Sequence, residues 1–337
     1  MKIKSWGCRG SIAINNPNSK IYGGNTTCFE VISDCLPSGT KLMFDAGTGF
    51  VPAGRHYLSE SSNDLNYVIL FTHYHWDHVL GLTLSPPTFI DHIPMSFYGP
   101  KDGESGLNEM MRHLFQRPYF PVDAQKLLHK MSFTTFTNYD VEVVIVHPEG
   151  GFTNINYNDY KKILDGNQQL LIDQKNYNIN ECMVITMTKT NHGNSTCISY
   201  RVEELPTSKT FVLLTDHEDT AGISMDIKNH LKNVDLAIID GQYDDYKYQT
   251  QTANFGHGTP GGLIKLAIAS NVARVGITHH DPTSTDSYLE DTILTEAYEA
   301  YDNWSSNEKF LKVHKVDKLS LNKDNIFLCK DYELYQL

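Results

Sequence analysis

Short hydrophobic runs that end in a polar, chemically reactive side chain recur along this chain. The first is KLMFDAGTG at residues 41–49, where an apolar run leads to Asp45 and a glycine turn. The others are NYVILFTHYHWDH at 66–78, TFVLLTD at 210–216, DLAIID at 235–240 and RVGITH at 274–279. Continuous apolar strands of this length are typical of sheets covered on both faces. We therefore expect buried strands whose Asp and His ends gather along one edge of a sheet.

Helical patterns alternate with these runs. The clearest is GGLIKLAIASN at 261–271, with Thr259 as the expected N-cap and Pro260 at the first helical position. Strands and helices that alternate in this way favour a layered α/β protein.

The organisation of the chain follows from where this alternation is lost. We expect a single domain over residues 1–337, with an insertion at about 154–180 that is rich in Asn, Tyr, Gln and Lys. A C-terminal extension at about 290–337 has the pattern of a helix followed by a β-like tail.

Charge and composition narrow the classes of function. The chain has 28 Lys and Arg against 40 Asp and Glu, a net charge of −12, which disfavours extended nucleic acid as a partner. No apolar run approaches the roughly 18 residues that span a bilayer, so we expect no membrane insertion. The N-terminal residues lack the apolar region of a signal peptide, and none of the six cysteines forms a C-x-x-C pair. We therefore expect a cytoplasmic protein with buried, free thiols.

The densest group of candidate metal ligands is THYHWDH at 72–78, which contains His73, His75, Asp77 and His78. Residues two apart in an extended segment point the same way, so His73 and His75 can bind one ion together. Asp77 and His78 follow at a turn and can reach a second ion. Imidazole and carboxylate suit Zn²⁺, with Mn²⁺ and Fe as alternatives.

HYHWDH fits the H-x-H-x-D-H motif of the metallo-β-lactamase superfamily. The chain resembles the branch that includes tRNase Z-type endonucleases, cyclic-nucleotide phosphodiesterases and phage-type anti-Pycsar enzymes. The motifs that carry this resemblance, in the order of that branch, are WGCRGSIA from Trp6, YGGNTTC from Tyr22, FDAGTG from Phe44, THYHWDHVLGL from Thr72, TDHED from Thr215, DGQY from Asp240, FGHGT from Phe255 and THHDP from Thr278. The resemblance implies an αββα sandwich, in which helices flank two mixed sheets.

The resemblance also implies a site for two divalent metal ions. The first ion would be held by His73, His75 and His192, the second by Asp77, His78 and His279, and both by a bridging Asp216. Asp219 competes with Asp216, and His280 competes with His279. The ends of the expected strands favour Asp216 and His279, which leaves His280 to support the site or to face substrate.

Further residues have catalytic or supporting roles by the same resemblance. His257, just before the helix at 261–271, would contact the phosphate and protonate the leaving oxygen, with Asp240 orienting its ring. Asp77 is counted as catalytic because losing it would disturb the second ion. Asp45 would support the ligands by accepting a hydrogen bond from a ligating histidine. Asn25 would brace the site or face substrate.

These inferences converge on a metal-dependent phosphodiesterase that hydrolyses a 3′,5′-cyclic nucleotide and forms a homodimer. Two divalent ions, with zinc as the first expectation, would activate a hydroxide for attack on phosphorus. The aromatic residues within 112–121 could stack on a nucleobase or serve ordinary packing. The alternatives are a tRNase Z-like endoribonuclease, a lactone- or β-lactam-type hydrolase, and a catalytically silent nucleotide-binding protein.

Overall fold

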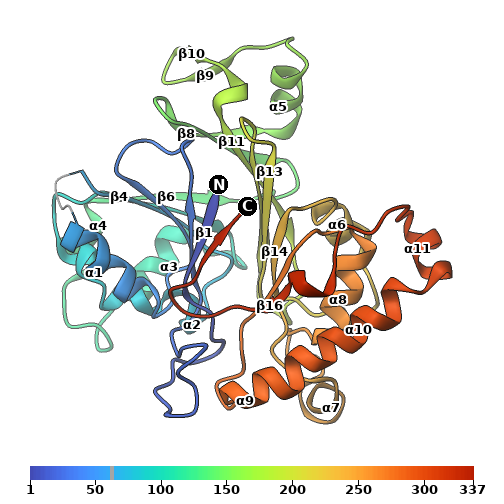
Figure 1. The fold of residues 1–337 in the computed structure, drawn as a ribbon. Helices are drawn as coiled ribbons and strands as arrows, with labels where there is room; N and C mark the ends of the chain where they lie inside the picture. The colour runs from blue at the N-terminus through green and yellow to red at the C-terminus, as the bar shows by residue number, and fades with distance from the viewer. Residues whose placement is uncertain (61–63) are drawn as a thin grey trace.

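Two mixed β-sheets pack face to face in this protein, and helices cover their outer faces (Figure 1). The computed structural model describes residues 1–60 and 64–337. In Figure 1 the helices of the blue and cyan N-terminal half lie on the left, and those of the orange and red C-terminal half lie on the right. The predicted layered α/β architecture is confirmed.

The first sheet belongs mainly to the N-terminal half. Its strand order is β17-β1-β2-β3-β4-β5-β6, and β3, β4, β5 and β6 run parallel to one another. The strands are β1 (Lys2–Gly7), β2 (Cys28–Ile32), β3 (Thr40–Phe44), β4 (Asn66–Leu70), β5 (Met95–Pro100), β6 (Met131–Phe136) and β17 (Leu334–Gln336).

The second sheet has the order β16-β15-β14-β13-β12-β11-β7-β8, with β13, β14, β15 and β16 parallel. Its strands are β7 (Glu142–His147), β8 (Gly151–Asn156), β11 (Met183–Lys189), β12 (Ile198–Glu204), β13 (Lys209–Leu214), β14 (Leu236–Asp240), β15 (Val275–Thr278) and β16 (Ile326–Leu328). The C-terminal segment thus contributes β16 to this sheet and β17 to the other.

Three apolar layers hold the sheets and helices together. The central layer lies between the sheets and includes Phe44, Tyr200 and Phe211. The two outer layers lie under the helices of each half. The helices are α1 (Phe50–Glu60), α2 (Trp76–Val79), α3 (Leu107–Leu114), α4 (Ala124–Leu128), α5 (Tyr157–Leu164), α6 (Met225–His230), α7 (Asp245–Lys247), α8 (Pro260–Ala269), α9 (Asp286–Tyr288), α10 (Thr295–Ser305) and α11 (Glu308–His314). Among the described residues no helix is long and apolar enough to cross a membrane.

The segment at 154–180 folds into regular secondary structure. It contains the end of β8, helix α5 and a small hairpin of β9 (Leu170–Ile172) and β10 (Lys175–Tyr177). Tyr160 and Ile163 of α5 bury themselves against Val143 and Val184 of the second sheet. These few apolar side chains fix the segment, which projects at the top of Figure 1.

The fold brings the polar strand ends to one region. Strands β3 and β4 are parallel neighbours, and β13, β14 and β15 are parallel neighbours in the facing sheet. The carboxyl ends of parallel neighbours lie at one edge of a sheet. The residues that follow these ends include Asp45, Asp216 and His279, as the pattern of apolar runs predicts.

Candidate metal centre

Seven histidine and aspartate side chains converge where the two sheets meet at their carboxyl-terminal strand ends. One group, whose ligand atoms all lie within 4.8 Å of one another, comprises His73, His75, His192 and Asp216. A second such group comprises Asp77, His78 and His279. A third, which shares Asp216 and His279 with these two, adds Asp240 and His257. The loop after β4 supplies the motif residues, and β11, β13 and β15 lead to the other three ligand candidates. The structure therefore places together every residue that the sequence nominates as a metal ligand.

Asp216 stands between the two groups. Its Oδ1 lies 3.7 Å from His73 Nε2 and 3.6 Å from His192 Nε2, while its Oδ2 lies 3.2 Å from His78 Nε2. Oδ1 also lies 3.4 Å from His279 Nε2, so the carboxylate faces histidines of both groups. This is the placement that a bridging ligand needs.

The second group is equally close. Asp77 Oδ2 lies 3.1 Å from His279 Nε2 and 3.3 Å from His78 Nε2. A tetrahedral ion with bonds of about 2.0–2.1 Å has its ligand atoms about 3.3 Å apart. The spacings in both groups are therefore those of side chains that share a small cation.

The chemistry of the donors also fits a cation. In the described part of the chain, the buried Nε2 atoms of His73 and His78 face Asp216 at 3.7 and 3.2 Å without a well-aligned hydrogen bond. A buried polar atom without a partner costs free energy. A divalent cation between these nitrogens and the carboxylates would satisfy both, so the residues present fit the metal ions that the sequence implies.

Hydrogen bonds on the far side of the rings fix which nitrogen faces the centre. His192 donates from Nδ1 to the carbonyl of Gly256 at 2.9 Å, which turns Nε2 toward Asp216. His78 Nδ1 lies 2.8 Å from Asp45 Oδ2, and Asp45 also accepts from Thr72. Such outer partners orient metal-binding histidines. Asp45 therefore sits where the sequence analysis expects a supporting carboxylate.

Three residues of the site adopt a backbone conformation that is rare for side chains other than glycine. Asp45, Asp216 and His279 have φ values of 59°, 53° and 61°. Each follows the end of a parallel strand, so the left-handed turn redirects the chain just where a side chain must enter the centre. Backbone strain of this kind costs on the order of 1–3 kcal/mol and clusters at functional sites.

The buried carboxylates of the cluster favour positive charge on the groups next to them. Burial alone would raise the pKa of Asp216, yet the imidazoles of His279 and His78 hold that pKa well below its usual range. Burial alone would lower the pKa of His279, yet Asp216 and Asp77 raise it to about 9. The carboxylates therefore favour cations among them, and metal binding would displace protons from the histidines.

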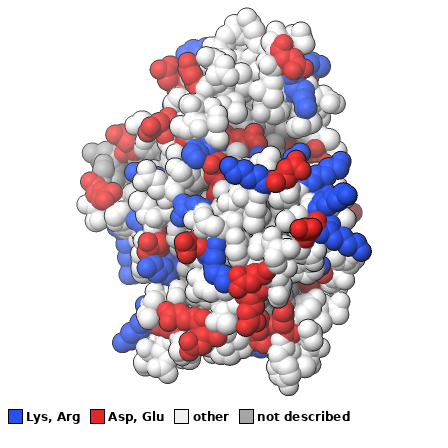
Figure 2. Space-filling view, turned by 45° about the vertical axis from the view of Figure 1, so that its right-hand side comes forward, with Lys and Arg blue, Asp and Glu red and all other residues white. Residues whose placement is uncertain are grey.

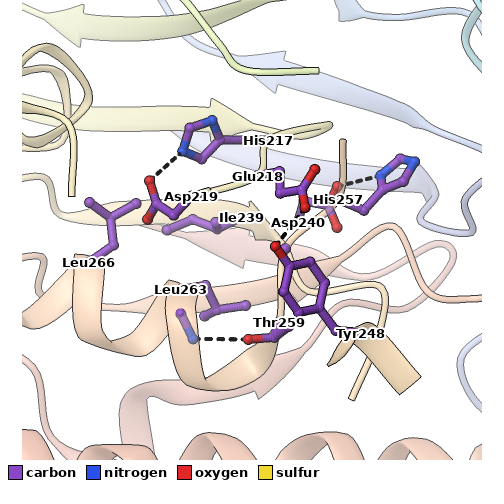
Figure 3. A pocket seen from close by; sticks show the side chains of 12 residues that line it. His217, Glu218, Asp219, Ile239, Asp240, Tyr248, His257, Thr259, Leu263 and Leu266 are labelled. Carbon is purple, nitrogen blue, oxygen red and sulfur yellow. Dashed lines mark hydrogen bonds and ion pairs between the residues drawn. The ribbon is translucent and has the colours of Figure 1, made fainter. Parts of the chain in front are cut away.

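His257 lies beside the ligand groups, paired with a carboxylate. Its Nδ1 is 2.8 Å from Asp240 Oδ2 (Figure 3). The same nitrogen is 3.9 Å from Asp216 Oδ1. Asp240 ends β14, and its other oxygen accepts from the backbone of Gln242 at 3.0 Å. This fixed carboxylate holds the proton on Nδ1 and leaves Nε2 free to act on a bound molecule.

Two of the nominated supporting residues point away from the centre. His280 Nε2 lies 2.8 Å from the carbonyl oxygen of Cys329. The Asn25 side-chain amide donates a hydrogen bond to the hydroxyl of Tyr332 at 3.0 Å. Both side chains therefore contact the C-terminal segment. Asp219, the competitor of Asp216, pairs with His217 at 3.1 Å instead of entering the ligand groups.

Glu218, which was not predicted from the sequence, is a buried carboxylate that anchors the loop carrying His257. Its Oε1 accepts from the Tyr248 hydroxyl at 2.6 Å and from Asn254 N at 2.7 Å, and its Oε2 accepts from Gly256 N at 2.8 Å. Figure 3 shows Glu218 between Tyr248 and the His257–Asp240 pair. The only available signal was its position two residues after Asp216.

Close backbone packing around the ligands was missed as well. A Cβ added to Gly10 would lie 2.3 Å from His279 Nδ1, and one added to Gly256 would lie 2.3 Å from His192 Nδ1. The backbone amide of Ser11 donates to Asp77 Oδ2 at 2.7 Å. The N-terminal loop therefore shapes the second ligand group directly.

Comparison with known proteins identifies the fold. Residues 22–148, which include Asp45 and the HYHWDH loop, match the family model of the Metallo-beta-lactamase superfamily. This match covers 127 of the 337 residues, so the N-terminal part of the chain resembles a domain of that superfamily. His192, Asp216 and His279 lie beyond the match and follow strands of the second sheet.

Relatives with this domain are distant. Ribonuclease Z of Clostridium acetobutylicum is 23% identical over 271 residues, which cover 75% of this chain and 83% of the relative. Ribonuclease Z of Sulfurisphaera tokodaii is 25% identical over 271 residues, which cover 74% of this chain and 81% of the relative. Unliganded yeast PDE1 superposes with a TM-score of 0.62 at 13% identity, over 100% of this chain and 99% of that one. The predicted αββα metallo-β-lactamase fold is confirmed.

Proposed function

We propose that this protein is a metal-dependent phosphodiesterase that hydrolyses a 3′,5′-cyclic nucleotide. The observation that carries the proposal is the His257–Asp240 pair, 2.8 Å apart, at the edge of two groups of metal-ligand candidates. Hydrolysis of a phosphodiester produces an alkoxide that must be protonated as it leaves. A buried histidine fixed by a carboxylate beside the centre is suited to that step.

Two divalent cations bound by the seven ligands would lower the pKa of water and neutralise charge that develops on the phosphate. Zinc is the first expectation, because five of the seven proposed ligands are imidazoles and the other two are carboxylates. Mn²⁺ and Fe remain the alternatives.

The protein's own side chains would donate the proton and position the phosphate. Asp240 keeps the Nδ1 proton of His257 in place, so that Nε2 carries the proton given to the departing ribose oxygen. His257 lies three residues before Pro260, the first residue of α8, and Thr259 caps that helix by accepting from Gly262 N at 3.2 Å. The helix N-terminus beside His257 favours an anion such as phosphate.

A tRNase Z-like endoribonuclease is the second candidate, and the two Ribonuclease Z relatives favour it. Both candidates cleave a phosphodiester, so the centre alone suits either. The net charge of −12 supports the small substrate. On the face in Figure 2, acidic side chains gather over the lower half and basic ones are interspersed with acidic ones above them.

The experiment that tests the proposal offers the metal-loaded protein a panel of substrates. The panel contains 3′,5′-cyclic nucleotides, cyclic oligonucleotides, precursor tRNA, bis(p-nitrophenyl) phosphate and a lactone. We expect the highest kcat/KM with a cyclic mononucleotide. Turnover that is highest with precursor tRNA would establish the second candidate instead, and turnover of the lactone alone would exclude both.

The expected homodimer and cytoplasmic location remain predictions. Light scattering on the purified protein measures its mass in solution directly. A mass near twice the 38.2 kDa of one chain supports the dimer, and a mass of one chain contradicts it.

A further inference from the structure

An apolar groove opens beside the loop that carries four of the candidate metal ligands. Its cavity volume is about 420 Å³, within the range of pockets for small organic ligands. The residues that define its two walls and rim are Tyr74, Trp76, Val79, Leu114, Arg117 and Tyr119. None of these is a metal-ligand candidate, so the groove is distinct from the centre.

The near wall of the groove comes from the loop that carries four of the candidate metal ligands. Trp76 lies between His75, in the first ligand group, and Asp77, in the second. Adjacent Cα atoms are about 3.8 Å apart, so the indole begins within one residue of both ligand groups. Tyr74 is held by a 2.6 Å hydrogen bond from its hydroxyl to the carbonyl of Pro100. The groove therefore begins at the loop that supplies ligand candidates to both groups.

The far wall comes from α3 and the loop that follows it. Phe115 and Phe120 are buried, and their rings pack edge-to-face with centroids 5.0 Å apart. These two anchors fix the loop and leave the intervening Tyr119 ring 88% exposed. Across the groove, Trp76 is 61% exposed. In the described chain, neither ring pairs with another aromatic side chain, so both faces are free to stack.

The charge of the groove also points to the occupant. Arg117 lies on it, and no Asp or Glu does, although the chain as a whole carries a net charge of −12. Trp, Tyr and Arg are the side chains on which nucleobases stack in proteins that bind single-stranded nucleic acid. An aromatic, weakly basic groove therefore suits a base joined to an anion.

We propose that this groove binds the nucleobase of a mononucleotide whose phosphodiester lies at the metal centre. The inference rests on the proposed phosphodiesterase function and adds where the base is recognised. Stacking against Trp76 and Tyr119 holds the ring, and Arg117 lies beside it. One arginine and a volume of about 420 Å³ suit one nucleotide, whereas a polynucleotide needs a basic track that continues beyond the groove.

The test is the variant Tyr119→Ala, because this exposed ring can be removed without opening the core. Its matched control is Tyr246→Ala, which removes a tyrosine that is 74% exposed on α7, outside the groove. The substrates are cyclic AMP, cyclic CMP, a base-free ribose 3,5-cyclic phosphate and a short single-stranded RNA, with turnover followed by ³¹P NMR.

We expect Tyr119→Ala to raise KM for the cyclic nucleotides at least fivefold, from the loss of base stacking, with a much smaller change in kcat. The ratio of kcat/KM between cyclic AMP and the base-free phosphate falls by the same factor, whereas the control keeps that ratio. An unchanged ratio in Tyr119→Ala would overturn the proposal. A loss of activity confined to the RNA would overturn the choice of a mononucleotide.

A binding measurement separates this inference from the proposed function. Trp76 is the exposed tryptophan, while Trp6 is buried and Trp304 packs on Phe310 with centroids 4.7 Å apart. We expect AMP to quench tryptophan fluorescence, and Trp76→Phe to remove most of that change. Quenching without turnover of any phosphodiester would refute the proposed phosphodiesterase function and support base binding in the groove. Turnover without quenching, and with no effect of Tyr119→Ala, would refute base binding in the groove and support the phosphodiesterase function.

Discussion

Replacing Glu218 with glutamine tests how the loop that carries His257 is held. The carboxylate accepts three hydrogen bonds of 2.6–2.8 Å, from Tyr248, Asn254 N and Gly256 N. Glutamine has nearly the same shape but only one oxygen. If the glutamine oxygen accepts from Tyr248 and Asn254, the glutamine NH2 group faces the N–H of Gly256. Two hydrogen-bond donors then face each other, and the loop must shift to separate them.

The cost can be estimated from these contacts. A hydrogen bond to a charged group contributes about 1.5–3 kcal/mol, and a buried donor left unpaired costs about 1–3 kcal/mol. We therefore expect Glu218→Gln to destabilise the closed loop by about 3 kcal/mol. Because Gly256 O accepts from His192 Nδ1, the displaced loop would disturb a ligand of the first ion together with His257.

The assay compares kcat, KM and metal affinity in Glu218→Gln with those in Asp219→Asn, a neighbouring carboxylate that contacts His217 and not the loop. We expect kcat to fall at least tenfold, one metal ion to bind more weakly, and the melting temperature to fall by only a few degrees. Asp219→Asn keeps the parent values. Parent kcat and parent affinity for both ions in Glu218→Gln would refute the reasoning.

Three further outcomes follow from the structure. His257→Ala removes the proton donor and should lower kcat by about 100-fold or more while elemental analysis still finds the parent metal content; loss of metal would assign His257 to the ligands. Gly10→Ala places a Cβ 2.3 Å from His279 Nδ1, so titration should show weakened binding of one ion and not the other. Burial lowers the pKa of His230 to about 3, so the unfolded chain takes up a proton first as pH falls below about 6.5. The stabilisation that this residue contributes is complete above that pH, and below it the free energy of unfolding falls by about 1.4 kcal/mol per pH unit. In urea denaturation from pH 7 to pH 5, His230→Gln should therefore lose less stability than the parent. An equal dependence of stability on pH in the two proteins would contradict this.

The sequence predicts the layers and the ligand cluster because both depend on local signals. Apolar runs that end in Asp45, Asp216 and His279 are strands, and the parallel order of those strands brings their ends together. The HYHWDH loop is contiguous, so its four candidates need no tertiary information to be grouped.

What sequence could not predict depends on contacts between distant segments. Glu218 is one acidic residue among 40 Asp and Glu, and its role arises only when the loop at 248–257 folds over it. His280 turns toward Cys329, 49 residues away, so adjacency to His279 does not bring its side chain to the centre. The order of the 154–180 segment likewise depends on a few apolar side chains that meet the outer face of the second sheet.

The central claim is that residues from both sheets converge on two divalent cations. Anomalous diffraction from crystals of the protein loaded with Zn²⁺ measures this directly. The account predicts two peaks, one among His73, His75 and His192, the other among Asp77, His78 and His279, with Asp216 touching both. Diffraction from fully loaded crystals with no peak at either position, or with the ions held elsewhere, would contradict it.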